Sequence, residues 1–240
     1  MEYLSNRQGV FTQISLFSVL LGGRYGGVCS IADVKKAGNL AIATMDRLDG
    51  EMQMIDGVVY QACADGRLLL PKDDETIPYG TIAQFAPEQE LSLGGIPCFE
   101  EFEERMKREC PGLNLPMAVH LKGEFLHVKV RAVWRQERDG VGLAEAARNE
   151  AVFELDGISG DMVGFRLPGY VQGVNAPGWH LHFVDDARRH GGHVVNFTLK
   201  QGTMGVCWAR EFRITLPDVL NELDLDRDWS DDLHKAEGER

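Results

Sequence analysis

The sequence predicts an α/β (α+β) protein with two closely packed subdomains, residues 1–145 and 146–240, built on mixed or antiparallel β-sheets. Three observations predict this fold class. Helix-like and strand-like segments alternate in the first half, the second half is almost entirely strand-like, and no low-complexity linker separates the halves. The length of 240 residues suits one large domain or two small ones.

The first subdomain opens with helical patterns and then changes to strands. Phe11 to Leu21 has apolar residues at helical spacing and predicts a helix, and residues 30–33 (Ser-Ile-Ala-Asp) have the form of a helix start. From Leu40 the apolar period shortens to two, and Asp56-Gly57 predicts a hairpin turn. Three further segments follow: a strand at 81–85, an amphipathic helix at 99–110, and two strands within 120–133 joined at Lys122-Gly123-Glu124.

The second subdomain is β-rich. A helix-like stretch at 143–153 leads into it. Strand-like segments, separated by Gly, Pro and Asp turns, follow at 162–167, 180–184, 194–199 and 206–216. Asp218 to Arg240 is an acidic tail, and Trp229 within it is large enough to anchor the tail against the body of the protein.

Composition excludes several classes of partner. Lys and Arg number 25 against 37 Asp and Glu, which gives a net charge of −12 and argues against a nucleic-acid partner. The apolar stretch Ile14 to Gly23 is about half as long as a membrane span requires, and no basic cluster or cleavage site accompanies it. We therefore expect a cytoplasmic protein with no membrane partner.

The strongest chemical signal is a group of histidines in the second half. Residues 178–184 read Gly-Trp-His-Leu-His-Phe-Val, so His180 and His182 project from the same face of a strand. A short connection, 185–192, can return the chain so that His193 faces the same point from the neighbouring strand. Three imidazoles leave open positions on zinc or another divalent metal, as in catalytic metal sites. The alternative is that these histidines are solvated or hydrogen-bonded, and His190 fits a solvated turn residue.

Two other segments carry polar groups at suggestive positions. In residues 125–131, alternation places Leu126, Val128 and Val130 on a core face and His127, Lys129 and Arg131 on the other. An arginine in a pocket can bind a carboxylate with two hydrogen bonds, but a solvated row explains the pattern equally well. Residues 48–51, Leu-Asp-Gly-Glu, place a carboxylate after a turn, where most such groups are exposed.

Taken together and in order, these segments resemble the α-acetolactate decarboxylase family. Residues 38–52 (Gly-Asn-Leu-Ala-Ile-Ala-Thr-Met-Asp-Arg-Leu-Asp-Gly-Glu-Met) resemble the family's Gly-Asp-Phe-Gly-x-Gly-Thr-x-x-x-Leu-Asp-Gly-Glu segment. Val130-Arg131, residues 135–137 and residues 178–193 resemble later family blocks, and the similarity covers about residues 10 to 217. The sequence departs from the family pattern at Asn39, at Ala41, at 138–140 and at 149–153, where Asn-Glu-Ala-Val-Phe replaces an Asn-Gln-Pro-Val-Phe-like stretch.

The resemblance implies a set of site residues. By it, His180, His182 and His193 hold zinc or another divalent metal, and Glu51, Arg131 and Thr44 lie in the pocket. It also implies a glutamate from the C-terminal tail at the metal, for which Glu237 is the best match and Glu239 the substitute. The choice between Glu51 and Glu237 as the proton-handling carboxylate stays open, as does a proton-relay role for Arg131.

The function implied by the resemblance is decarboxylation of (S)-2-acetolactate to (R)-acetoin and CO2 by a homodimer. Zinc would be the electron sink for an enediolate, so no organic cofactor is needed. Two alternatives stand beside it. The first is a cupin-type metal-dependent oxygenase, although this sequence has no Glu at short spacing after His182, where such enzymes have one. The second is a non-catalytic small-molecule binding module with a structural metal. Anaerobic turnover of the 2-hydroxy-3-oxo acid would distinguish all three.

Overall fold

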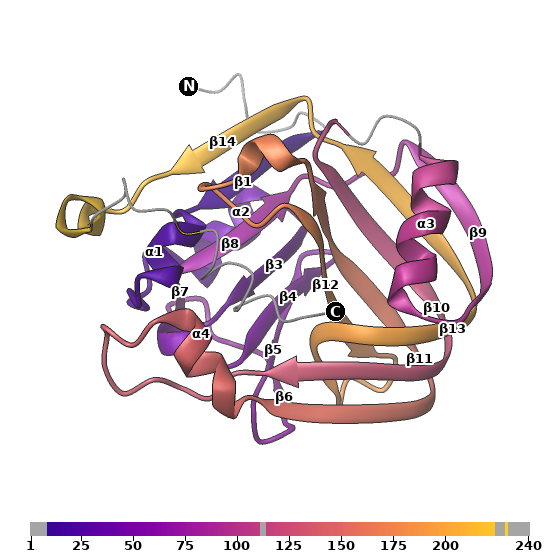
Figure 1. The fold of residues 1–240 in the computed structure, drawn as a ribbon, viewed down its shortest axis with the longest axis horizontal. Helices are drawn as coiled ribbons and strands as arrows, with labels where there is room; N and C mark the ends of the chain where they lie inside the picture. Colours follow the sequence, from indigo (N-terminus) through magenta and orange to yellow (C-terminus); the bar gives the residue numbers. More distant parts are fainter. Residues whose placement is uncertain (1–8, 111–113, 224–228, 230–240) are drawn as a thin grey trace.

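The computed structural model describes residues 9–110, 114–223 and 229 (Figure 1). It is a mixed α+β fold dominated by two β-sheets, which confirms the predicted fold class. Four α-helices accompany the sheets in the described residues: α1 (Phe17–Leu21), α2 (Ile31–Ala37), α3 (Phe99–Glu109) and α4 (Leu143–Ala146). Within the same residues, none of these helices has the length and apolar character needed to cross a membrane.

The first sheet has seven strands, and all neighbouring pairs except β1–β14 are antiparallel. Its order is β14 (Glu211–Thr215), β1 (Val10–Ile14), β8 (Tyr79–Ala83), β3 (Leu40–Thr44), β4 (Glu51–Ile55), β5 (Val58–Ala62) and β6 (Leu68–Leu69). The Asp56-Gly57 hairpin is confirmed between β4 and β5, with both residues at positive φ as a tight primed turn requires. A separate two-stranded sheet pairs β2 (Cys29–Ser30) with β7 (Thr76–Ile77).

This first sheet is covered on both faces. On β3, Leu40 and Ile42 pack toward the second sheet, whereas Ala41 and Ala43 pack toward α2. Helix α2 is capped by Ser30, whose hydroxyl accepts a hydrogen bond from the backbone N–H of Asp33, so the predicted helix start is confirmed. The period of two expected from Leu40 is not found in β3, which is a continuous apolar run because both of its faces are buried.

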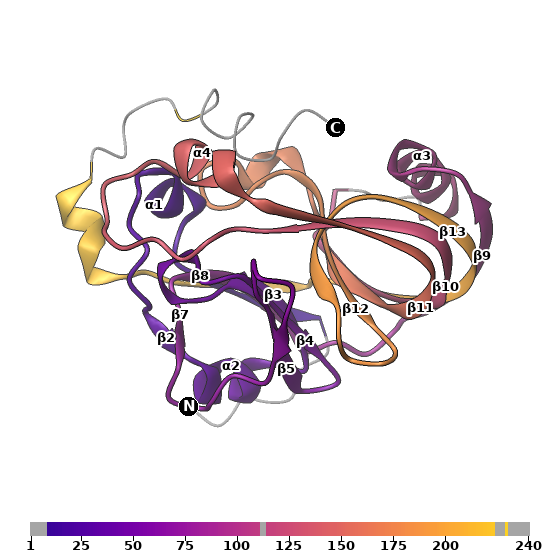
Figure 2. The same cartoon turned by 90° about the horizontal axis from the view of Figure 1, so that it is seen from below.

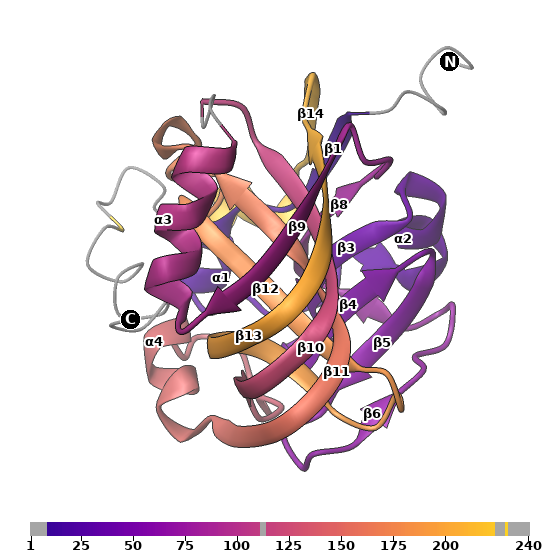
Figure 3. The same ribbon diagram turned by 90° about the vertical axis from the view of Figure 1, so that its right-hand side faces the viewer.

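The second sheet has five strands. Its order is β10 (Met117–Ala132), β11 (Ala151–Leu167), β12 (Gly178–Asp185), β13 (Gly191–Trp208) and β9 (Gln89–Ile96). Strand β10 also pairs with β13, so β10 to β13 close on one another around a core of their own (Figure 3). Helix α3 packs Phe99, Phe102 and Met106 onto this core and confirms the predicted amphipathic helix. In Figure 2, α3 lies at the upper right beside the second sheet, and α2 lies at the bottom beneath the first sheet.

The predicted pair of strands within 120–133 is wrong, because β10 runs straight through Lys122-Gly123-Glu124. Gly123 lies opposite Gly160 on β11 and Gly202 on β13. A Cβ on Gly123 would sit 2.7 Å from the carbonyl oxygen of Gln201. This glycine therefore marks a close approach of neighbouring backbones, not a turn. The predicted strands at 194–199 and 206–216 also differ from the structure. Residues 194–199 and 206–208 belong to one continuous strand, β13, while β14, the later part of the second segment, lies in the other sheet.

The predicted helix over Phe11 to Leu21 is half wrong. Residues up to Ile14 form β1, inserted between β8 and β14, and only Phe17–Leu21 is helical. Ser15, with a φ of 64°, makes the break between the two. Residues 143–153 divide similarly into α4, a 3-10 turn at 147–149 and the start of β11. In each case pairing with distant strands overrides the local helical pattern.

The sheets divide the chain differently from the predicted halves. Strands β9 and β10 precede residue 145 but belong to the second sheet, and β14 follows it but belongs to the first. Apolar residues of both sheets meet in one interface, among them Leu40, Phe165 and Val184. The division into subdomains 1–145 and 146–240 stays a prediction.

Candidate functional site

Strands β12 and β13 bring three histidines together. His180 and His182 share one face of β12, and His182 lies directly opposite His193 in the antiparallel pairing. The Nε2 of His180 is 3.2 Å from the Nε2 of His182 and 3.0 Å from the Nδ1 of His193. Among the described residues, this is the group of three or more His, Cys, Asp or Glu side chains with the geometry to hold a metal ion.

The spacing of the three nitrogens fits a metal. Metal–nitrogen bonds of about 2.0–2.1 Å in a tetrahedral arrangement put neighbouring nitrogens about 3.3–3.4 Å apart. The distances of 3.0 and 3.2 Å are close to that spacing, and three ligands leave a position for substrate or water. An all-imidazole set suits zinc, copper, iron and nickel, so it does not choose among divalent metals.

His182 is oriented by the first sheet. It is fully buried, and its Nδ1 donates to the backbone carbonyl of Met52 on β4 at 3.0 Å. That bond leaves the lone pair on Nε2, which faces the other two imidazoles. Burial, with His180 and Arg131 adding to it, lowers the pKa of His182 well below its usual range. The imidazole is therefore neutral, as a metal ligand must be.

Strands β3 and β4 supply Thr44 and Glu51, which lie opposite each other in the sheet. Glu51 Oε2 is 3.6 Å from His182 Nε2, and the Glu51 side chain is only 12% exposed. Thr44 is buried, and its hydroxyl donates to the carbonyl of Gly50 at 3.1 Å. The tight connection at residues 45–50 therefore decides where both side chains point.

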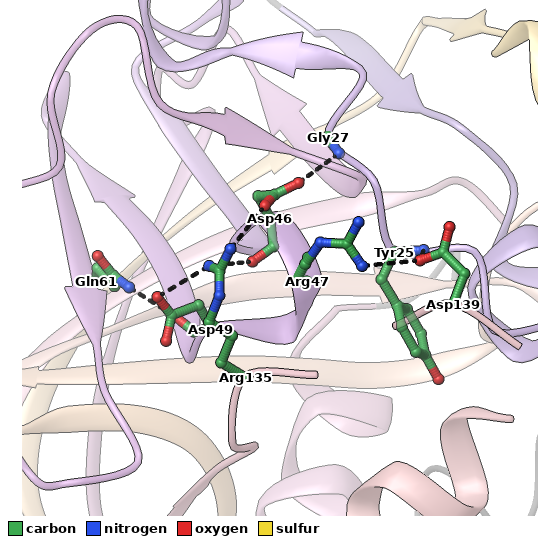
Figure 4. Close-up of polar contacts among 8 residues, drawn as sticks. All are labelled: Tyr25, Gly27, Asp46, Arg47, Asp49, Gln61, Arg135 and Asp139. Carbon is green, nitrogen blue, oxygen red and sulfur yellow. Dashed lines mark hydrogen bonds and ion pairs between the residues drawn. The ribbon is translucent and has the colours of Figure 1, made fainter. Parts of the chain in front are cut away.

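That connection is held in an unusual conformation. Arg47 and Leu48 both have positive φ, 58° and 57°, which costs free energy for residues with a Cβ. Arg135, just after β10, reaches the Asp46 carbonyl and the Asp46 and Asp49 carboxylates at 3.4–3.5 Å (Figure 4). Asp139 pairs with Arg47 at 3.5 Å. The segment after β10 therefore fixes the connection that carries Glu51.

Gly50 in this connection is expected to resist any side chain. Its φ is 82°, and a Cβ there would collide with the carbonyl oxygen of Ala62. Gly57→Ala, at φ 80° with open space around it, should cost about 1–2 kcal/mol of unfolding free energy from backbone strain alone. Gly50→Ala should cost about 1–3 kcal/mol more, because the collision adds to the strain. Chemical denaturation of both variants measures the difference in unfolding free energy. Equal losses would contradict the collision between a Cβ at position 50 and the Ala62 carbonyl oxygen.

Strand β10 supplies Arg131, which lies opposite His193 in register. Its Nη2 is 3.4 Å from His193 Nε2, and its Nη1 donates to Glu150 Oε2 at 3.0 Å. The rest of the row is solvated: His127 pairs with Glu154 and Asp156, and Lys129 with Glu154. The core face is as predicted at Val128 and Val130.

Leu126 does not lie on the core face, where the alternation predicts it. It is 56% exposed, because the register shifts on both sides of Phe125 turn Phe125 into the core in its place.

One pocket unites these groups. Thr44, Glu51, Arg131, His180 and His193 line it, and His182 lies behind them. The remaining wall is mostly apolar, contributed by the two sheets, α1, α4 and the turn after α4: Phe17, Leu20, Ile42, Ala43, Leu48, Tyr79, Thr81, Val133, Leu143 and Ala147. An apolar wall with a few convergent polar groups is the usual form of a small-molecule site.

Comparison with known proteins points to the family that the sequence resembles. The family model described as alpha-acetolactate decarboxylase matches residues 11–225. This chain belongs to the alpha-acetolactate decarboxylase family. The family member from Methanosarcina mazei is 37% identical over 97% of this chain and 82% of its own length, and that from Bacillus subtilis is 31% identical over 94% and 90%. The crystal structure of alpha-acetolactate decarboxylase from B. subtilis strain 168 matches with a TM-score of 0.92 and 30% identity, covering 96% of this chain and 100% of that chain.

The resemblance to the alpha-acetolactate decarboxylase family pointed to five lining residues of the pocket, Thr44, Glu51, Arg131, His180 and His193, but not to its apolar wall. His190 pairs with Asp185 at 3.3 Å, outside the histidine group, as a turn residue. Glu237 and Glu239 lie outside the described residues. Two residues were missed as contributors: Glu150, which pairs with Arg131, and Arg135, which holds the 45–50 connection. Their sequence blocks drew attention, but no local pattern reveals which distant residue each one contacts.

Proposed function

We propose that the protein decarboxylates (S)-2-acetolactate to (R)-acetoin and CO2. The observation that carries this proposal is one pocket lined by the Arg131 cation and the largely buried Glu51 carboxylate, beside three histidines that could hold a metal ion. The substrate is a carboxylate anion with adjacent ketone and hydroxyl oxygens. The cation can bind its carboxylate, and a metal on the histidines can bind its oxygens. His180, His182 and His193 would hold a zinc ion, which would supply Lewis-acid polarisation of the ketone.

Arg131 is assigned to orientation and charge stabilisation. Its guanidinium stays protonated, which makes it a poor proton donor but a constant hydrogen-bonding cation. A tight clamp on a carboxylate that must leave as neutral CO2 would stabilise the ground state and slow the reaction. Arg131 therefore serves best by placing the carboxylate and then stabilising the negative charge that develops on the substrate oxygens.

Glu51 is assigned to proton handling at the substrate. Glu51 is the one acidic side chain among the described residues that line the pocket. Glu51→Gln is expected to lower kcat about a hundredfold, the lower range for a general acid or base, while metal content stays near the wild-type value. The matched control is Glu154→Gln, which removes the same charge from a surface ion pair. Loss of metal together with activity would instead make Glu51 a ligand.

The tail glutamate, Glu237, is proposed as a second carboxylate at the same site.

The test is product analysis with racemic acetolactate. The proposal expects equal amounts of acetoin and CO2, acetoin of the R configuration, and half of the substrate consumed in the fast phase. The oxygenase alternative requires O2 uptake, and the binding-module alternative gives no acetoin. Either result would overturn the proposed function.

Metal identity, assembly and location are part of the same proposal. We take zinc as the resident metal, a homodimer as the assembly and the cytoplasm as the location, on the family resemblance stated above. Elemental analysis and light scattering measure the first two directly.

A further inference from the structure

Arg131 shares its guanidinium with a carboxylate of the protein itself. Its Nη1 donates to Glu150 Oε2 at 3.0 Å, and the two side chains are only 14% and 22% exposed. The neighbouring nitrogen, Nη2, lies 3.4 Å from His193. Glu150 therefore holds one corner of the guanidinium while the other faces the histidine group.

The fold brings Glu150 to this position. It follows the turn at 147–149 and precedes β11, whose first residues pair with the end of β10: Ala151 with Ala132 and Val152 with Arg131. Ala147, in the same turn, lines the pocket.

We propose that Glu150 is a positioning residue that holds Arg131 and weakens its affinity for the substrate carboxylate. The proposal rests on the proposed function. Glu150 and the substrate carboxylate are like charges that meet at one cation, so the protein carboxylate reduces the attraction that the guanidinium offers to an incoming anion. The repulsion at the carboxylate position falls as the substrate loses CO2, because CO2 is neutral and the negative charge moves onto the former ketone and hydroxyl oxygens until a proton is taken up.

Such an arrangement favours reaction over binding. An interaction that weakens ground-state binding without weakening the transition state raises kcat. The fixed guanidinium also avoids reorganisation when charge develops on the substrate oxygens. Glu150 therefore offsets the overly tight clamp that an unshared arginine would make.

The test measures carboxylate affinity and turnover separately, on the metal-loaded protein. Calorimetric titration uses 2-hydroxyisobutyrate, a carboxylate that cannot react because it lacks the ketone, with acetoin as the neutral probe. Glu150→Gln should bind 2-hydroxyisobutyrate about fivefold more tightly, the effect of one unit charge about 4 Å away in water, and bind acetoin unchanged. For acetolactate, both KM and kcat should fall.

Controls separate charge from structure. Glu154→Gln removes the same charge four residues along the chain and should leave carboxylate affinity unchanged. Glu150→Asp keeps the charge and should stay near wild type. Unchanged or weaker 2-hydroxyisobutyrate binding by Glu150→Gln would overturn the proposal, as would an equal shift in Glu154→Gln. If acetolactate is not turned over at all, the proposed function fails, while the calorimetric comparison still decides the role of Glu150.

Discussion

His182→Ala is expected to lose bound metal and at least about a hundredfold of the acetoin-forming rate. The estimate is a lower bound, since mutating the outer partners of metal ligands already costs about 10–100-fold. His182 is buried, donates to the Met52 carbonyl and presents Nε2 to the other two histidines. Its removal leaves two imidazoles, too few to retain the ion at ordinary concentrations.

The matched control for His182→Ala is His190→Ala. His190 lies in the connection between the same two strands but contacts Asp185 rather than the histidine group. It should keep wild-type metal content and turnover. Elemental analysis and acetoin release are measured on the same preparations. If His182→Ala keeps both metal and turnover, the three-histidine centre is not the catalytic one.

Arg131→Lys is expected to keep the fold and the metal but to lose about a hundredfold in kcat, as when one stabilising donor of a transition state is removed. Lysine preserves the charge but lacks the planar fork, so it cannot reach Glu150 and the substrate at once. The metal content should not change, because the arginine is not a ligand.

Lys129→Arg tests whether the position matters more than the residue type. Lys129 is two residues away on the same strand and pairs with Glu154 at the surface. This exchange should leave the kinetics unchanged. Wild-type kinetics in Arg131→Lys would show that turnover does not need the guanidinium group of Arg131.

The histidine group was predictable because its geometry is local. A period of two fixes His180 and His182 on one face, and a short connection brings His193 back opposite His182. Glu51 and Thr44 followed from the resemblance, and their pairing across β3 and β4 rests on an equally short connection. Helix α2 and the Asp56-Gly57 hairpin were predictable from capping and turn residues for the same reason.

Features that depend on distant partners were not predictable. The segment at 10–14 has a helical pattern, but pairing with β8 and β14 makes it a strand. Gly123 has the local form of a turn, although it is a close contact between three strands. The Arg131–Glu150 pair joins the end of one strand to the start of another across an intervening helix and turn, and periodicity carries no information about such a contact.

A metal titration of turnover without oxygen tests most directly whether the three-histidine centre carries the decarboxylation. The protein is stripped with a chelator, transferred to an anaerobic chamber and given increasing zinc, with acetoin formation from acetolactate measured at each step. We expect almost no acetoin without metal and a linear rise that saturates at about one metal per chain, the capacity of one three-histidine centre. Full turnover by the stripped protein, or product formation only after O2 is admitted, would contradict this expectation.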